Sequence, residues 1–65
     1  MTTAAISRAS SLADAFVATY AGDEHAGILA ALDLLARAAG DAAHATELQT
    51  AARCALISAL RGGAE

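Results

Sequence analysis

Both histidines of the chain follow a glycine–aspartate step. The first step reads GDEH over residues 22–25, and the second reads GDAAH over residues 40–44. Histidine and carboxylate side chains bind metal ions, and Zn²⁺ needs about four such ligands converging on one point. The other candidate ligands are Cys54, Asp41 and Glu47. The repeated step therefore raises the question of whether the chain holds a metal site or an acid–base site.

The spacing of these residues argues against a metal site. His44 and Glu47 share a helix face, but their order is H-x-x-E, whereas di-iron carboxylate bundles use E-x-x-H with further glutamates on partner helices. His25 and His44 stand at the starts of two different expected helices, about one helix length apart. We therefore predict no metal and no cofactor. The pattern leaves open whether a dimer brings His25 or His44 against its symmetry mate.

Cys54 is the only candidate nucleophile. It lies in the middle of the helical stretch AARCALISAL, not at a helix N-terminus, where a thiolate would be favoured. A free cysteine in such a position usually behaves as a small hydrophobic residue. No glycine-rich loop follows a strand, so phosphate binding is not indicated. We expect no enzyme activity, because a chain of 65 residues seldom builds a deep pocket.

The glycine–aspartate steps fit the boundaries between helices. The chain has no proline and is about one-third alanine, the strongest helix former. Gly22 and Gly40 each suit the end of a helix, and Asp23 and Asp41 each suit the N-cap of the next one. The sequence predicts a single small all-α domain over residues 1–65. Its helices are expected over about 4–21, 24–39 and 42–61, with flexible ends at 1–3 and 62–65.

Each expected helix has apolar residues at three-and-four spacing, which is typical of a buried face. In the first helix these are Ile6, Ala9, Leu12, Ala13, Phe16, Val17 and Tyr20. In the second they are Ile28, Leu32, Leu35 and Ala39, widened by Leu29, Leu34 and Ala36. In the third they are Ala45, Leu48, Ala52, Ala55, Leu56, Ala59 and Leu60. The first helix begins at Thr3 or at Ser11, since both fit a cap.

Short connections make neighbouring helices antiparallel, so the predicted fold is a three-helix antiparallel bundle, a helical hairpin plus the N-terminal helix. Such a small domain is marginal alone, and its apolar positions exceed what three helices can bury. We therefore predict a homodimer that forms a larger bundle. The candidate partner or dimer contacts are Phe16, Tyr20, Leu29, Leu34, Cys54 and Ile57. The candidate acidic contacts are Asp23, Glu24, Asp33, Asp41 and Glu47.

The charge balance disfavours nucleic-acid binding. The net charge is −3, with four arginines, no lysine and only two aromatic residues, whereas phosphate contacts call for a basic surface. One alternative is a helix-turn-helix DNA-binding regulator, because ARAAG at 36–40 has the A-x-x-x-G spacing of that motif. Its recognition residues would be Thr46, Gln49, Thr50 and Arg53. Asp41 and Glu47 would then face phosphate, which argues against it.

No apolar run is long enough to span a membrane, and we expect no signal peptide, because Arg8 and polar residues occupy the place of its apolar region. With its single cysteine, the chain is expected in the cytoplasm. The best-supported function is that of a small acidic helical module that binds a partner protein as a regulator, accessory subunit or inhibitor. Chains of this size and charge include antitoxins and phage or mobile-element inhibitors of host defence nucleases, such as anti-CRISPR proteins. No motif here identifies one of these.

Overall fold

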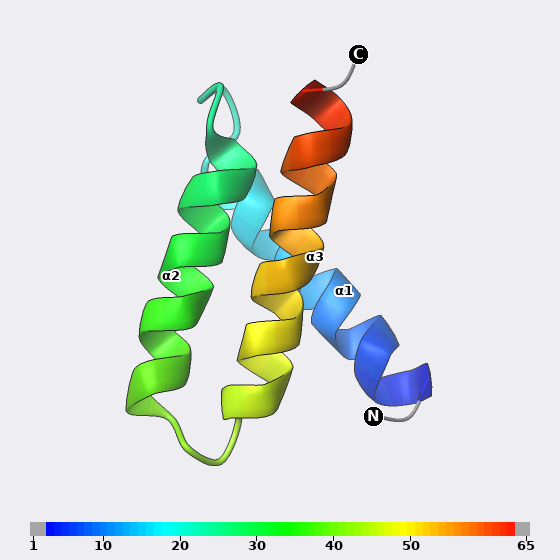
Figure 1. The fold of residues 1–65 in the computed structure, drawn as a ribbon, viewed down its shortest axis with the longest axis vertical. Coiled ribbons are helices and arrows are strands. Elements are labelled where there is room, and N and C mark those ends of the chain that lie inside the picture. The colour runs from blue at the N-terminus through cyan, green and yellow to red at the C-terminus, as the bar shows by residue number, and fades with distance from the viewer. Residues whose placement is uncertain (1–2, 64–65) are drawn as a thin grey trace.

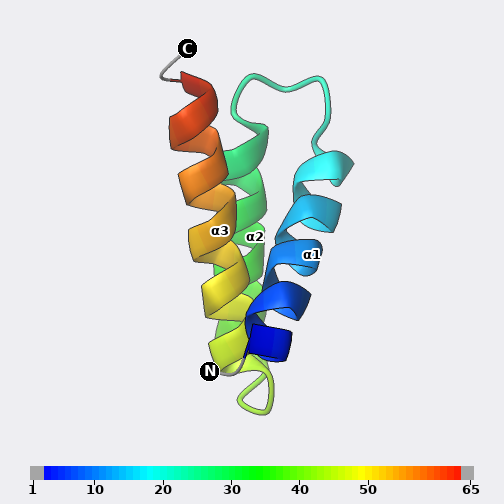
Figure 2. The same ribbon diagram turned by 90° about the vertical axis from the view of Figure 1, so that its right-hand side faces the viewer.

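Three helices account for nearly all of the structure, a computed structural model that describes residues 3–63. They are α1 (Thr3–Thr19), α2 (Ala26–Gly40) and α3 (Ala45–Gly63), and no strand occurs within residues 3–63. The all-α prediction is confirmed. In Figures 1 and 2, α2 and α3 lie side by side along their lengths, and α1 crosses behind this pair. The molecule therefore has two layers, the α2–α3 pair and α1.

Gly22 and Asp23 shape the connection between α1 and α2. Gly22 has a φ of +96°, a left-handed conformation that glycine adopts without a Cβ penalty. The side chain of Asp23 accepts a hydrogen bond from the backbone N–H of His25 at 2.8 Å, and its carbonyl accepts one from Ala26 at 3.2 Å. These bonds close a turn of their own. As a result, α2 begins at Ala26, two residues later than predicted.

Asp41 has the same role before α3. Its carboxylate accepts a hydrogen bond from the backbone N–H of His44 at 3.2 Å, and His44 Nδ1 lies 3.0 Å from its second oxygen. The turn over 42–44 precedes the helix, so α3 begins at Ala45 and not at residue 42. α2 ends at Gly40, one residue beyond the predicted end, and Gly40 does not adopt a left-handed conformation. Instead, the N–H of Asp41 bonds to Ala38 O at 3.4 Å.

The outer ends of the helices extend further than predicted. α1 begins at Thr3, so the longer of the two predicted starts is correct and Ser11 lies within the helix. α3 continues to Gly63, two residues beyond the predicted end at Arg61. Among the positions expected to be flexible, Thr3 and residues 62 and 63 lie within helices. The other positions, 1–2 and 64–65, lie outside the described residues.

Small side chains fill the core. Leu34 is the only large side chain that is fully buried among the described residues. The other core residues are alanines: Ala9, Ala13, Ala30, Ala31, Ala38, Ala51, Ala52 and Ala55. Larger side chains, including Leu12, Phe16 and Leu48, are half-buried around them. Because alanine has so short a side chain, the helix backbones can approach closely.

Gly27 lies at a close approach of α2 to α3. A Cβ atom added at Gly27 would lie 2.5 Å from Ala59 Cβ and 3.0 Å from the carbonyl oxygen of Ala55. No side chain larger than hydrogen fits there without movement of one helix. Gly27 therefore sets the spacing of the hairpin and places the start of α2 beside the last turns of α3.

The main row of the predicted buried face of α2 is wrong, because Ile28, Leu32 and Leu35 are exposed. Leu34, which was predicted to widen that face, is buried, and Gly27, Ala30, Ala31 and Ala38 face the interior with it. Close packing of two backbones favours the small-residue side of α2, because the larger side chains would hold the helices apart. The prediction for α3 is partly wrong for the same reason. Ala52 and Ala55 are buried, but Leu56 and Leu60 are exposed. In α1, Ala9 and Ala13 are buried and Ile6 is exposed.

Candidate interaction surface

Polar and aromatic contacts join α1 to one side of α2. The hydroxyl of Tyr20 donates a hydrogen bond to Asp33 Oδ2 at 3.0 Å, and Arg37 Nε donates one to Asp33 Oδ1 at 3.1 Å. The guanidinium of Arg37 also lies over the ring of Phe16, 5.1 Å from its centroid. These residues place Asp33 and Arg37 on the α1 side of α2.

The Asp33 carboxylate also changes the acidity of Tyr20. The hydrogen bond from the hydroxyl to Asp33 raises the pKa of Tyr20 above its usual value of 10.0. Partial desolvation and the negative charge of Asp33 act in the same direction, and the positive charge of Arg37 opposes them. The neutral phenol is therefore the form that this contact favours.

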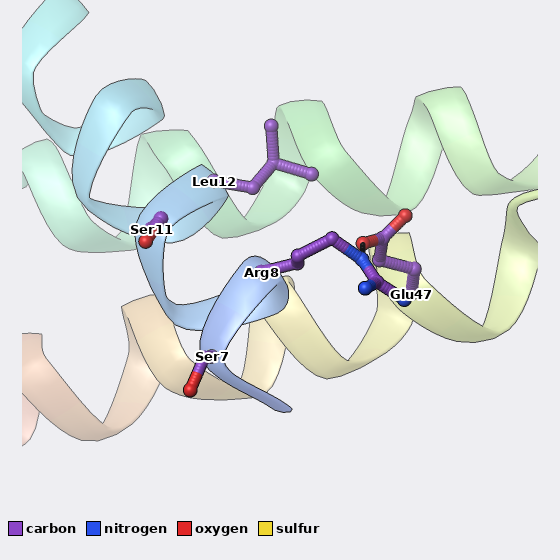
Figure 3. Close-up of a pocket in the computed structure, with 5 residues that line it drawn as sticks. All are labelled: Ser7, Arg8, Ser11, Leu12 and Glu47. Atoms are coloured by element: carbon purple, nitrogen blue, oxygen red, sulfur yellow. Dashed lines mark hydrogen bonds and ion pairs between the residues drawn. The ribbon is translucent and has the colours of Figure 1, made fainter. Parts of the chain in front are cut away.

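A second polar contact joins α1 to α3. Arg8 Nε lies 3.4 Å from Glu47 Oε1, and the two side chains reach toward each other across an open groove (Figure 3). Ser7, Ser11 and Leu12 line the rest of this groove. The Arg8 side chain is well exposed, so the pair contributes little stability. The pair does show which side of α3 faces α1, because Glu47 lies on that side.

Large apolar side chains occupy the opposite side of α2. Ile28, Leu32 and Leu35 are 44%, 59% and 44% exposed. Their spacing of four and then three residues puts them in one row along the helix. At 3.6 residues per turn, this row lies roughly half a turn from Asp33 and Arg37. It therefore points away from α1.

A second exposed row continues this surface on α3. Leu56 and Leu60 are 38% and 74% exposed. They lie roughly half a turn from Glu47, so they also point away from α1. The contact of Gly27 with Ala55 and Ala59 puts the start of α2 level with Leu56. We call these five residues, Ile28, Leu32, Leu35, Leu56 and Leu60, the α2/α3 apolar face. Figure 1 looks onto the side of the α2–α3 pair that is turned away from α1.

Among the six residues predicted to contact a partner, Leu34 requires a correction. It is fully buried within the single chain and presents no surface to another molecule. It lies on the same side of α2 as Ala30, Ala31 and Ala38, which face the interior. The large residues left outside are its neighbours on the other side of the helix.

The other five predicted contacts are spread over the molecule. Phe16 and Tyr20 are half-buried in the contact between α1 and α2. Leu29 and Cys54 are half-buried as well. Ile57 is exposed, but it lines a groove with Ser10 and Asp14 of α1 and with Cys54. The structure therefore does not bring these five residues together on one surface.

Each of the five acidic residues proposed as a partner contact has a neighbour within the chain. Asp23 and Asp41 accept hydrogen bonds from the turns they begin, and Asp33 binds Tyr20 and Arg37. Glu24 lies 3.4 Å from His25 Nε2, and Glu47 pairs with Arg8. None belongs to the α2/α3 apolar face. Their positions are explained by turns and helix contacts.

The two histidines are at opposite ends of the molecule. His25 lies in the connection before α2 and His44 in the connection before α3, and Figure 1 shows these connections at opposite ends. Both side chains are exposed. Within residues 3–63, no three His, Cys, Asp or Glu side chains come together in a group that could hold a metal ion. In the same part of the chain, no helix has the length and apolar character needed to cross a membrane.

The arrangement of α2 and α3 differs from a helix-turn-helix motif. The two helices of that motif cross at about 90–120°, whereas α2 and α3 lie side by side along their lengths in both views. Thr46, Gln49 and Arg53 are exposed on α3, and the Thr50 hydroxyl donates to Thr46 O at 2.9 Å. The DNA-binding alternative therefore gains no support from the relation between the two helices.

The α2/α3 apolar face is not predicted from the sequence, because two rows in α2 have similar spacing. One row consists of large aliphatic side chains, and the other combines Gly27 and three alanines with Leu34. The presence of a glycine inside a helix was the available signal. Glycine is unfavourable there, so its position often marks a close approach of another backbone. Burial of the glycine row would have left the leucines outside.

Comparison with models of protein families, with curated proteins and with solved structures found no match to this chain. Support for a function therefore comes from the exposed surface itself, which combines two apolar rows on adjacent helices.

Proposed function

We propose that this chain is an antiparallel three-helix bundle that acts by binding protein through its α2/α3 apolar face. In this proposal it is a cytoplasmic interaction module, a regulator, accessory subunit or inhibitor, and not an enzyme. The observation that supports it is the exposure of five large aliphatic side chains in two adjacent rows. Exposed apolar patches rimmed by polar residues mark interaction sites more often than inert surface.

Covering this face supplies part of the free energy that association requires. Burying one Leu or Ile side chain completely contributes about 1.5–3 kcal/mol. The five side chains are between 38% and 74% exposed, so covering them contributes roughly 4–8 kcal/mol from this chain alone. Association costs about 4–15 kcal/mol in lost translational and rotational freedom. A partner must therefore contribute apolar surface of its own.

A protein fits this requirement better than a membrane or a nucleic acid. Helices that lie on membranes usually have lysine and arginine on their polar face, whereas this chain has no lysine and a net charge of −3. Nucleic acids need basic side chains for phosphate and aromatic rings for stacking. The α2/α3 apolar face contains neither, because all five of its residues are aliphatic.

Affinity capture with matched variants tests this proposal. The wild-type chain, Leu32→Glu and Ile6→Glu are tagged and recovered from the cells that produce the protein. Ile6 is a matched control because it is a similarly exposed aliphatic residue on α1, outside the α2/α3 apolar face. We expect at least one protein, which can be the untagged chain itself, to be retained by wild type and Ile6→Glu and lost with Leu32→Glu. Identical captured sets for all three chains would contradict the proposal.

A further inference from the structure

We infer that the partner of the α2/α3 apolar face is a second copy of this chain, joined to the first by two-fold symmetry. This inference rests on the proposed function and names the occupant of the same face. The two copies meet with the α2–α3 layers in contact and the two α1 helices on the outside. The spacing of the exposed rows, the size of the face and the composition of the core support it.

The spacing of the exposed row on α2 suits packing against another helix pair. Ile28, Leu32, Leu35 and Ala39 follow one another at intervals of four, three and four residues. All four are exposed. This is the spacing of the contact row in a helical bundle, where each side chain inserts between residues of the facing helix. An occupant with a like row fits this surface, and the chain itself carries one.

The second row has the same intervals and a mixed composition. On α3, Gln49, Arg53, Leu56 and Leu60 are separated by four, three and four residues. Only the half near the C-terminus is apolar. Neither row contains a carboxylate. A partner selected by basic charge would find no acidic residue in either row, so the face is built for apolar contact.

The size of the face agrees with that of a stable dimer. The broad profile of the molecule measures 34 by 24 Å, and α2 and α3 fill most of it in Figure 1, with the start of α1 projecting beside them. The α2–α3 side of the molecule therefore extends over at most roughly 800 Å², which is about the area that each partner buries in a standard interface. Two-fold symmetry brings two such faces together. Each copy then supplies the apolar surface that the other requires.

The small side chains in the core of the single chain also favour a partner for the α2/α3 apolar face that is always present. Its fully buried side chains are alanines and one leucine. Domains of this size commonly rely on oligomerisation for stability. A second copy is available wherever the chain is made, which is not true of an unrelated partner. The same face therefore completes the fold of both copies.

Sedimentation equilibrium of the purified chain, with circular dichroism on each variant, tests the inference. We expect wild type at micromolar concentration to have the mass of two 6.4 kDa chains. Leu32→Glu should raise the dissociation constant at least about tenfold while the chain stays helical, because a buried carboxylate without a partner opposes association. Ile6→Glu, the control on α1, should remain a dimer. Leu60→Glu is a second variant, placed near a helix end where folding tolerates it best.

The outcomes separate this inference from the proposed function. A wild-type chain that sediments as one copy would overturn the second-copy inference. So would a dimer that neither Leu32→Glu nor Leu60→Glu weakens, because the two copies would then meet through another surface. In either case, loss of a captured protein in Leu32→Glu would still support the proposed function. If Leu32→Glu changes neither the mass nor the captured proteins, both proposals are wrong.

Discussion

Individual residues in this chain have their effect mainly through their size. Gly27 and the alanines beside it let α2 and α3 approach closely, and Leu34 is the one large side chain they enclose. Ile28 and Leu32, their neighbours in sequence, are exposed. A change of one methyl group therefore has a different effect on each side of the same helix.

Gly27→Ala should destabilise the fold. The added Cβ would meet Ala59 Cβ at 2.5 Å, and overpacking of this kind costs about 1–3 kcal/mol. Alanine's better helix propensity offsets about 1 kcal/mol of that. Urea denaturation should show a net loss of stability. Gly40→Ala is the control, since no neighbouring atom lies within 4 Å of its added Cβ. Equal effects of the two substitutions would contradict the close approach at Gly27.

Tyr20 should make the fold sensitive to alkaline pH. Its hydrogen bond to Asp33 raises the pKa of Tyr20 above 10.0 in the folded chain. A raised pKa means that the contribution to stability is fully present below pH 10.0 and is lost as the pH rises through the folded-state value. The chain has one tyrosine, so ultraviolet absorbance follows its ionisation directly.

Tyr20→Phe is the control for this prediction. Without the hydroxyl, unfolding measured against pH should lack the part of the alkaline loss that coincides with ionisation of Tyr20. A tyrosine that ionises in the folded chain at its ordinary pKa would show that the bond to Asp33 does not form.

At the scale of helices, the sequence predicts number, type and order well. The two glycine–aspartate steps locate both connections because aspartate caps and a left-handed glycine are local signals. The starts of α2 and α3 were displaced by two and three residues, since Asp23 and Asp41 close separate turns before the helices begin. These turns depend on hydrogen bonds that the residue types alone do not distinguish from an N-cap.

The side of each helix that is buried was harder to predict. α2 is apolar around most of its circumference, so two faces fit a buried row equally well. Which one is used depends on the spacing between α2 and α3, a property of the pair and not of either segment. The spacing of apolar residues in the sequence could therefore not predict the α2/α3 apolar face, although all of its residues were recognised as apolar.

Asp41→Ala should weaken the start of α3. The substitution removes the acceptor for the backbone N–H of His44 in the turn before the helix, and loss of such a hydrogen bond costs about 0.5–1.5 kcal/mol. Thermal unfolding followed by circular dichroism should show a lower midpoint. Asp14→Ala removes an exposed carboxylate from the middle of α1 and should leave the midpoint unchanged or slightly raised. An unchanged midpoint in Asp41→Ala would contradict this prediction and would show that backbone hydrogen bonds alone hold the turn.

On the scale of the whole molecule, the distribution of apolar residues follows from the fact that α1 covers only one side of the α2–α3 pair. α1 shields one side of the α2–α3 pair, where Phe16 lies under Arg37 of α2 and Arg8 pairs with Glu47 of α3. Tyr20, directly after α1, adds its hydrogen bond to Asp33. The other side carries the α2/α3 apolar face. The fold thus separates a core of alanines and one leucine from an exposed set of larger aliphatic side chains.

If a second copy covers this face, stability should depend on protein concentration. Association that favours the folded state raises the unfolding midpoint as concentration increases. We expect this rise for wild type and for Ile6→Glu and a constant midpoint for Leu32→Glu. Calorimetry over a wide range of concentrations measures it. A wild-type midpoint that does not change with concentration would indicate that folding is complete within one chain.

The close approach at Gly27 also has a consequence for recognition. Because Gly27 lies against the backbone of Ala55 and against Ala59, α2 and α3 cannot slide past each other without a clash. The two exposed rows are thus held in a fixed relation before anything binds. A preorganised surface loses little conformational entropy on association, so more of the free energy of apolar contact remains as affinity. A single glycine can in this way favour binding through a face to which it contributes no atom.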